Sequence, residues 1–95
     1  MEPARTIFAD QTFRYTQLVR SGMVALYEQQ HKQGGSPRFE VVILRHMPAK
    51  TYPNGVVLPE REAYPSTREW GTYGWTFHTR PEAERWMAHL QEVRP

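Results

Sequence analysis

The side chains best suited to bind a ligand are crowded into residues 64–77, whose sequence is YPSTREWGTYGWTF. Its aromatic rings could stack on nucleic-acid bases, because every base presents a π face and each stacked base stabilises binding by about 1 to 3 kcal/mol. Nearby arginines could hold phosphates through their planar guanidinium groups. The pattern predicts a ligand-binding site formed by Arg61, Arg68, Trp70 and Tyr73.

Large aromatic side chains are also the main source of core packing in a small domain. Trp75 and Phe77 are therefore predicted to be core residues that face Trp86, while Trp70 has the alternative role of anchoring its loop. The sequence contains no HExxH or comparable metal spacing, no nucleophile elbow and no phosphate-binding glycine loop. We accordingly predict no catalytic residue, no cofactor and no metal.

A second group of residues has the ingredients of an acid–base centre. Glu60 and Glu62 lie in a proline-flanked loop, and His46 and His78 end two predicted strands on the face that carries Glu40. A solvated loop with internal ion pairs explains the crowded charges better than a catalytic site does. A small hydrolase built on these residues is our third hypothesis.

Composition indicates one small globular domain over residues 1–95, with 39% hydrophobic and 13% aromatic residues. The absence of cysteine excludes a disulfide scaffold and a thiolate metal site. The net charge is only +2, but ten of the twelve basic residues are arginine, which favours a phosphate or carboxylate partner. A GC-rich genome would produce the same bias without any functional reason.

No segment resembles a membrane span or a secretion signal. The longest apolar run is residues 41–44, whereas a spanning helix needs about 20 apolar residues. The sequence therefore predicts a cytoplasmic protein that does not contact membranes.

The first half of the chain predicts three strands. Residues 1–11 lack a period and are predicted to be a loosely held segment. Residues 12–20 alternate, with Phe13, Tyr15 and Gln17 on one face, and Ser21-Gly22 predicts a hairpin turn into a strand over 23–30. A helix over 12–31 is the alternative, at a cost of about 1 kcal/mol for the glycine in its middle.

Residues 38–47 predict a third strand after the glycine-rich loop 32–37. The next segment, 48–71, contains four prolines and predicts a long flap, with one short strand at 56–58. Ser66 and Glu69 have the spacing of a capping box, which predicts a helical turn over 67–70 that ends at Gly71.

The end of the chain carries the clearest signals. Residues 72–78 alternate as a strand, with Tyr73, Trp75 and Phe77 on one face. A second capping box at Thr79 and Glu82 begins a helix predicted over 80–91, whose apolar residues recur on one side.

These elements predict a two-layer α+β domain, in which an antiparallel sheet of about four strands packs one face against the C-terminal helix. The strand at 38–47 is apolar on both faces, and a single helix covers only one of them. The second face therefore needs the flap, a second copy of the chain or a ligand.

Three motifs, FEVV at 39–42, PEREAYPS at 59–66 and WGTYGWT at 70–76, resemble a type of small uncharacterised protein encoded on bacterial prophages and integrated mobile elements. The similarity covers about residues 23–90. It implies no activity and no site residue. It does imply a context in which proteins of this size more often bind nucleic acid or inhibit a host complex than catalyse a reaction.

Two functions are favoured over the hydrolase hypothesis. The first hypothesis is a non-enzymatic module that binds nucleic acid through Arg61, Arg68, Trp70 and Tyr73. The second is a protein-interaction factor that acts on a host complex, such as a defence system, through the uncovered sheet face, or that forms a homodimer through it.

Overall fold

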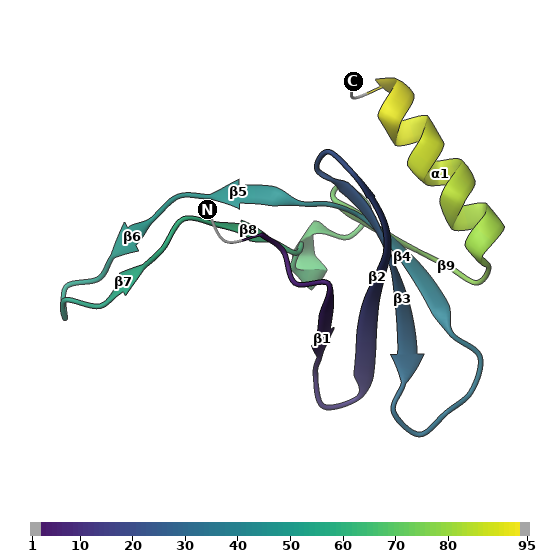
Figure 1. Ribbon diagram of the computed structural model, residues 1–95, viewed down its shortest axis with the longest axis horizontal. Coiled ribbons are helices and arrows are strands. Elements are labelled where there is room, and N and C mark those ends of the chain that lie inside the picture. The colour runs from purple at the N-terminus through teal and green to yellow at the C-terminus, as the bar shows by residue number, and fades with distance from the viewer. Residues whose placement is uncertain (1–2, 94–95) are drawn as a thin grey trace.

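The computed structural model describes residues 3–93 and contains a five-stranded antiparallel sheet with the strand order β1-β2-β3-β4-β9 (Figure 1). Its strands are β1 (Ile7–Ala9), β2 (Phe13–Ser21), β3 (Val24–His31), β4 (Arg38–Ile43) and β9 (Gly74–Phe77). The helix α1 (Arg80–Val93) packs on one face, against β3, β4 and β9. The α+β class and the C-terminal helix are confirmed, but the sheet has one more strand than predicted.

The space between α1 and the sheet holds the larger of two cores. Alternate residues of β3 and β4 meet one side of the helix there, as their period-two and period-3.6 patterns require. Trp75 and Phe77 pack on this core as predicted, and the ring of Trp75 meets Trp86 edge-on at 5.2 Å between centroids. The buried residues of this core are Val24, Leu26, Val41, Ile43, Ala83, Met87 and Leu90.

The β2–β3 hairpin excludes the helical alternative for residues 12–31. Gly22 lies at its turn with φ 60°, a conformation that glycine adopts without steric cost. A bulge between Gln17 and Val19 shifts the register, so Arg20 is opposite Ala25 and shares the face of Gln17. The strict alternation predicted for residues 12–20 would put Arg20 on the face opposite to Gln17. That part of the prediction was wrong because of the bulge.

The N-terminal segment, residues 3–11, is held against the sheet instead of forming the predicted loose arm; residues 1 and 2 of that prediction lie outside the described residues. Ile7–Ala9 pairs with β2 as the edge strand β1, and Ala4 is buried. The Tyr27 hydroxyl donates a hydrogen bond to the Arg5 carbonyl at 2.8 Å, and the Ala4 amide donates to the Glu62 carboxylate at 3.0 Å. These long-range contacts, which no local pattern reveals, fix the segment.

The predicted strand 38–47 divides at Leu44. Its amide donates to the Met23 carbonyl at 2.7 Å, and the chain then leaves the sheet. The next residues form β5 (Arg45–Met47), which pairs with β8 (Arg61–Ala63), followed by β6 (Lys50–Thr51), which pairs with β7 (Val57–Leu58). We call residues 45–63 the ribbon arm.

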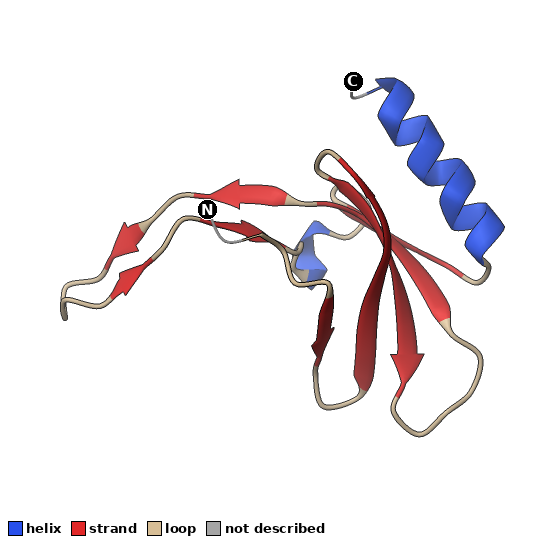
Figure 2. Cartoon of the chain, viewed as in Figure 1, coloured by secondary structure: helices blue, strands red, loops and turns tan. Residues whose placement is uncertain are grey.

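The ribbon arm projects away from the sheet and from α1, so most of the predicted flap does not cover the second sheet face (Figure 1, Figure 2). Figure 2 shows that it consists of strands and loops. The short strand predicted at 56–58 is observed as β7. The capping-box turn is also confirmed, as a 3₁₀ helix (Thr67–Glu69) in which the Ser66 amide donates to the Glu69 carboxylate at 2.9 Å.

Two segments cover part of the second sheet face, the N-terminal segment and residues 64–70. They surround a smaller core of buried Ala4, Ala25, Tyr27, Val42 and Leu44. The predicted flap over residues 48–71 is not confirmed: of this segment, only residues 64–70 pack on the second sheet face, through Tyr64 and Trp70. Within residues 3–93, no helix has the length and apolar character needed to cross a membrane.

Candidate nucleic-acid interface

The structure separates the two aromatic residues of the predicted site. Trp70 packs on the smaller core of the second sheet face, whereas Tyr73 packs on the helix-facing core. The Arg45 guanidinium lies over the Tyr73 ring at 4.9 Å and also forms an ion pair with Glu69. Trp70 and Tyr73 therefore do not form one stacking platform.

Trp70 lies flat against β9 because Gly74 leaves room for its ring. A Cβ atom at position 74 would lie only 2.6 Å from the indole. The indole N–H donates to the Thr76 hydroxyl at 3.0 Å, and that hydroxyl in turn donates to the Glu40 carboxylate at 3.4 Å. The position of the Trp70 ring is thus fixed by the absence of a side chain at Gly74 and by the hydrogen bond to Thr76.

Replacing Gly74 by alanine should displace the Trp70 ring and lower the free energy of unfolding by about 1 to 2 kcal/mol, because a well-packed site accepts an added methyl group only by moving its neighbours. Urea denaturation measures this loss. The matched control is the same substitution in a Trp70→Leu background, where the obstructing ring is gone and the loss should be much smaller. Equal losses in both backgrounds would contradict the assigned contact.

Five aromatic rings gather on the second sheet face. Tyr64 is central, with ring centroids 5.2 Å from Phe8, 5.1 Å from Tyr27 and 6.3 Å from Trp70. Tyr15 stacks on Phe8 at 4.6 Å with an interplanar angle of 12°. Edge and stacked contacts of this kind stabilise the cluster beyond simple burial. Except for Tyr27, these rings are only partly buried, so they also form the walls of surface hollows.

Three adjoining hollows follow this face, and together we call them the aromatic trough. The arginine hollow, about 350 Å³, is lined by Pro3, Ala4, Arg5, Phe8, Ala9, Tyr27, Arg61, Glu62 and Tyr64. The central groove, about 720 Å³, is lined by Phe8, Asp10, Phe13, Tyr15, Gln29, Glu40, Tyr64, Pro65, Ser66, Thr67 and Trp70. The loop hollow, about 340 Å³, is lined by Phe13, Gln29, His31, Gly34, Ser36 and Arg38.

The hollows are neighbours because they share side chains. Phe8 and Tyr64 line both the arginine hollow and the central groove, and Phe13 and Gln29 line both the central groove and the loop hollow. The trough therefore runs from the β8 side of the sheet to the β3–β4 loop. Its central groove combines five aromatic side chains with the carboxylates of Asp10 and Glu40.

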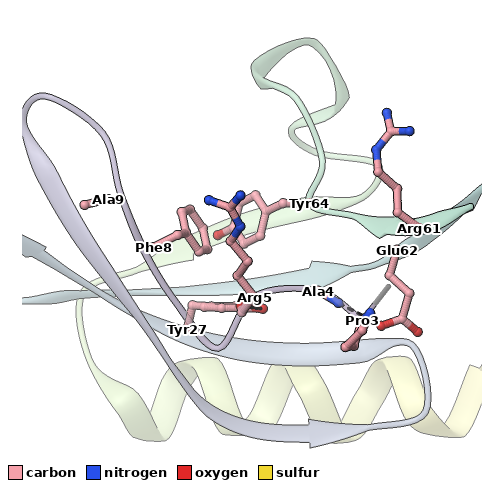
Figure 3. Close-up of a pocket in the computed structure, with 9 residues that line it drawn as sticks. All are labelled: Pro3, Ala4, Arg5, Phe8, Ala9, Tyr27, Arg61, Glu62 and Tyr64. Atoms are coloured by element: carbon pink, nitrogen blue, oxygen red, sulfur yellow. Dashed lines mark hydrogen bonds between the residues drawn. The ribbon is translucent and has the colours of Figure 1, made fainter. Parts of the chain in front are cut away.

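Arginines lie at both ends of the trough. Arg5 and Arg61 belong to the arginine hollow, and Arg38 belongs to the loop hollow. Figure 3 shows Arg5 beside the rings of Phe8 and Tyr64, while Arg61 extends outward from β8. The ion pairs formed within residues 3–93 involve none of these three guanidinium groups. They are therefore available to an anionic ligand.

Carboxylates occupy the central groove. Burial raises the pKa of Glu40, and hydrogen bonds from the hydroxyls of Tyr64 and Thr76 oppose that rise. Burial raises the pKa of Tyr64 far above its usual range, so its hydroxyl stays protonated and acts as the donor. Backbone amides of Phe13 and Thr12 lower the pKa of Asp10, which lies at the rim.

The remaining predicted residues lie apart from this groove. Arg61 is at the rim of the arginine hollow, and Arg68 is exposed in the 3₁₀ helix, next to Thr67, which lines the central groove. His46 pairs with Glu60 at 2.8 Å on the ribbon arm. The chain leaves the five-stranded sheet before His46, which lies in β5. The prediction that His46 shares a sheet face with Glu40 was therefore wrong.

The three hollows described above do not bring the acid–base candidates together: Glu62 lines the arginine hollow, whereas Glu60, His46 and His78 line none of the three. Glu62 forms a two-point ion pair with Arg20, with both N···O distances at 2.6 Å, and His78 is exposed after β9. In the described part of the chain, no three His, Cys, Asp or Glu side chains are grouped so that they could hold a metal ion.

Several trough residues were not in the predicted site. Phe13 and Tyr15 had a signal, their shared face on an alternating strand, and Tyr64 lay in the aromatic-rich segment. Arg5 and Phe8 had no sequence signal, because their segment lacks a period and joins the sheet only through distant partners.

No family model, no curated protein and no solved structure was found to match this chain.

Proposed function

We propose that this protein is a non-enzymatic binding module whose ligand is single-stranded nucleic acid, held in the aromatic trough. One observation carries the proposal: aromatic side chains line three adjoining hollows on one sheet face, and arginines that form no ion pair within residues 3–93 lie in the two outer hollows. Single-strand binders combine these two features, because bases stack on rings while cations hold the backbone.

The geometry favours a single strand over a duplex. Stacking on Phe8, Tyr64 or Trp70 requires a base whose face is free, and paired bases within a helix do not offer theirs. Phosphates toward the two ends of the bound strand would lie near Arg5 and Arg38, which line the two outer hollows. Of the residues expected from the sequence, Trp70 and Arg61 line the trough and keep their proposed roles, whereas Tyr73 lies on the other core.

Salt dependence provides the test. Fluorescence anisotropy with a labelled dT₈ strand should give a binding constant that falls with rising salt, because each phosphate contact releases counterions. The double variant Arg5→Gln/Arg38→Gln should bind more weakly and should reduce the log–log slope by about 1.4, since each lost contact to a single strand accounts for about 0.7. Arg85→Gln, on an exposed part of α1, is the matched control and should bind like the wild type.

Absence of binding at low salt, where counterion release most favours association, would reject the proposal. An equal loss of affinity in the Arg85→Gln control would also reject it, because the effect would then reflect total charge and not the trough.

A second candidate function, docking on a host protein or on another copy of the chain, is favoured by the end of the ribbon arm. Tyr52, Val56 and Val57 are 37%, 50% and 60% exposed there, outside both cores. Exposed apolar side chains on a projecting element are typical of protein contacts. This candidate predicts no salt-dependent oligonucleotide binding, so the same titration separates the two functions.

A further inference from the structure

We infer that the central groove selects guanine, with the Glu40 carboxylate reading the N1–H and the 2-amino group of the base. The inference rests on the proposed function and adds a base preference to it. It follows from the hydrogen-bonding state of the polar groups that line the groove.

Both oxygens of Glu40 are held as acceptors. The Tyr64 hydroxyl donates to Oε1. The Thr76 hydroxyl accepts a hydrogen bond from the Trp70 indole at 3.0 Å, so its own hydrogen is directed to Oε2, at 3.4 Å. A carboxylate oxygen has two lone pairs, so each oxygen of Glu40, which is 6% exposed and lines the groove, keeps one that its hydrogen bonds from Tyr64 and Thr76 do not use.

Other polar groups of the groove also present acceptors. The Asp10 Oδ1 atom accepts the amides of Thr12 and Phe13 at 2.8 and 2.6 Å, which leaves Oδ2 toward solvent with only a long contact to the Tyr15 hydroxyl. The Gln29 amide nitrogen donates to that hydroxyl at 3.0 Å, which leaves its carbonyl oxygen as an acceptor. A ligand that approaches Glu40 and Asp10 must therefore supply the hydrogen-bond donors, whereas Gln29 keeps a second N–H and Thr67 a hydroxyl that can donate elsewhere in the groove.

Guanine is the base that best meets this requirement. Its N1–H and 2-amino group are adjacent donors that match the two oxygens of one carboxylate. Adenine and cytosine place an amino group next to a ring acceptor, and thymine places its single N–H between two carbonyl acceptors, so each would set a lone pair against Glu40. Phe8, Tyr64 and Trp70 supply the aromatic walls against which the flat base would stack.

The inference is tested with dT₈ strands that carry one central dG, dA, dC or 2′-deoxyinosine, and with the wild-type protein. We expect the dG strand to bind about 10-fold more tightly than unmodified dT₈, the lower range of discrimination for a two-point base contact. Inosine keeps N1–H but lacks the 2-amino group, and it should lose most of this gain. These measurements do not depend on the folding of any variant.

The protein side is tested with Glu40→Gln, in which one acceptor becomes a donor. It should lose the preference for dG and keep the salt dependence of the wild type. Glu84→Gln, which makes the same change on an exposed part of α1 away from the trough, is the matched control and should keep the preference for dG.

The outcomes separate the inference from the proposed function. Equal, salt-dependent binding of all strands would overturn the guanine assignment and leave single-strand binding intact. Inosine binding as tightly as guanine would overturn it as well. If no strand binds, but acetyl-arginine amide quenches the tryptophan fluorescence of the wild type and not of Glu40→Gln, the groove receives a cationic side chain of a protein, and both proposals fail.

Discussion

Replacing Tyr27 by alanine should lower the free energy of unfolding by about 3 to 5 kcal/mol, the range for removing a large aromatic side chain from a core. Tyr27 is completely buried, and its ring packs edge-on against Phe8 and Tyr64 at 5.7 and 5.1 Å. The substitution would remove the ring on which the smaller core is assembled. Urea denaturation followed by circular dichroism measures the loss.

Two further variants divide this effect into its parts. Tyr27→Phe keeps the ring and loses only the hydroxyl, which joins the Gln17 amide and the Arg5 carbonyl at 2.9 and 2.8 Å, so it should cost about 1 to 2 kcal/mol. Tyr52→Ala, on the ribbon arm, should change stability by less than about 0.5 kcal/mol, since Tyr52 is 37% exposed. If Tyr27→Ala cost no more than Tyr27→Phe, the ring could not be a core element.

Elements with a local signal were predictable. The β2–β3 hairpin was marked by alternation and by Gly22 at its turn, and α1 by a capping box and an apolar stripe. In such cases the residues that determine the structure are a few positions apart in the sequence. Their preferences therefore agree with the fold without any knowledge of tertiary contacts.

Elements fixed by distant partners were not predictable in this way. β1 has three residues and becomes a strand because β2 accepts it as an edge. The division at Leu44 has no turn residue to mark it, and the prolines that suggested a covering flap instead interrupt the strands of the ribbon arm. A bulge at Leu18 then changed the face of Arg20, a one-residue effect that alternation alone does not contain.

The candidate site shows the same limit. Trp70 and Tyr73 are three residues apart, but Gly71, with φ 91°, turns the chain between them and sends their rings to opposite cores. Conversely, Arg5 and Arg61 are far apart in sequence and line one hollow, because β8 lies beside the N-terminal segment. Sequence identified the kind of side chain used, and topology decided which of them meet.

Replacing Glu62 by glutamine should lower the free energy of unfolding at neutral pH by about 1.5 to 3 kcal/mol, the range for hydrogen bonds to a charged group. The Glu62 carboxylate binds the Arg20 guanidinium at two points and also accepts the Ala4 amide at 3.0 Å. It therefore joins the ribbon arm, β2 and the N-terminal segment. The side chains of Arg20 and Glu62 are 24% and 11% exposed, so the loss of stability should lie between the values for a surface ion pair and a buried one.

The pH dependence of this loss identifies its cause. Hydrogen bonds from Arg20 and Ala4 lower the pKa of Glu62 from 4.5 to about 2. Because the folded pKa lies below the unfolded value, the stabilisation is complete above about pH 4.5 and disappears as the pH falls toward 2. The difference in stability between wild type and Glu62→Gln should therefore be constant from pH 7 to 5 and shrink below that.

Glu84→Gln is the matched control, since Glu84 pairs with Arg80 on the exposed side of α1, at 3.7 Å, where solvent screens the interaction. It should change stability by less than about 0.5 kcal/mol at any pH in this range. Limited proteolysis supplies an independent readout, because the N-terminal segment should be cut faster in Glu62→Gln than in Glu84→Gln. A stability difference that stayed constant down to pH 2 would show that the Glu62 carboxylate does not hold these three elements together through its charge.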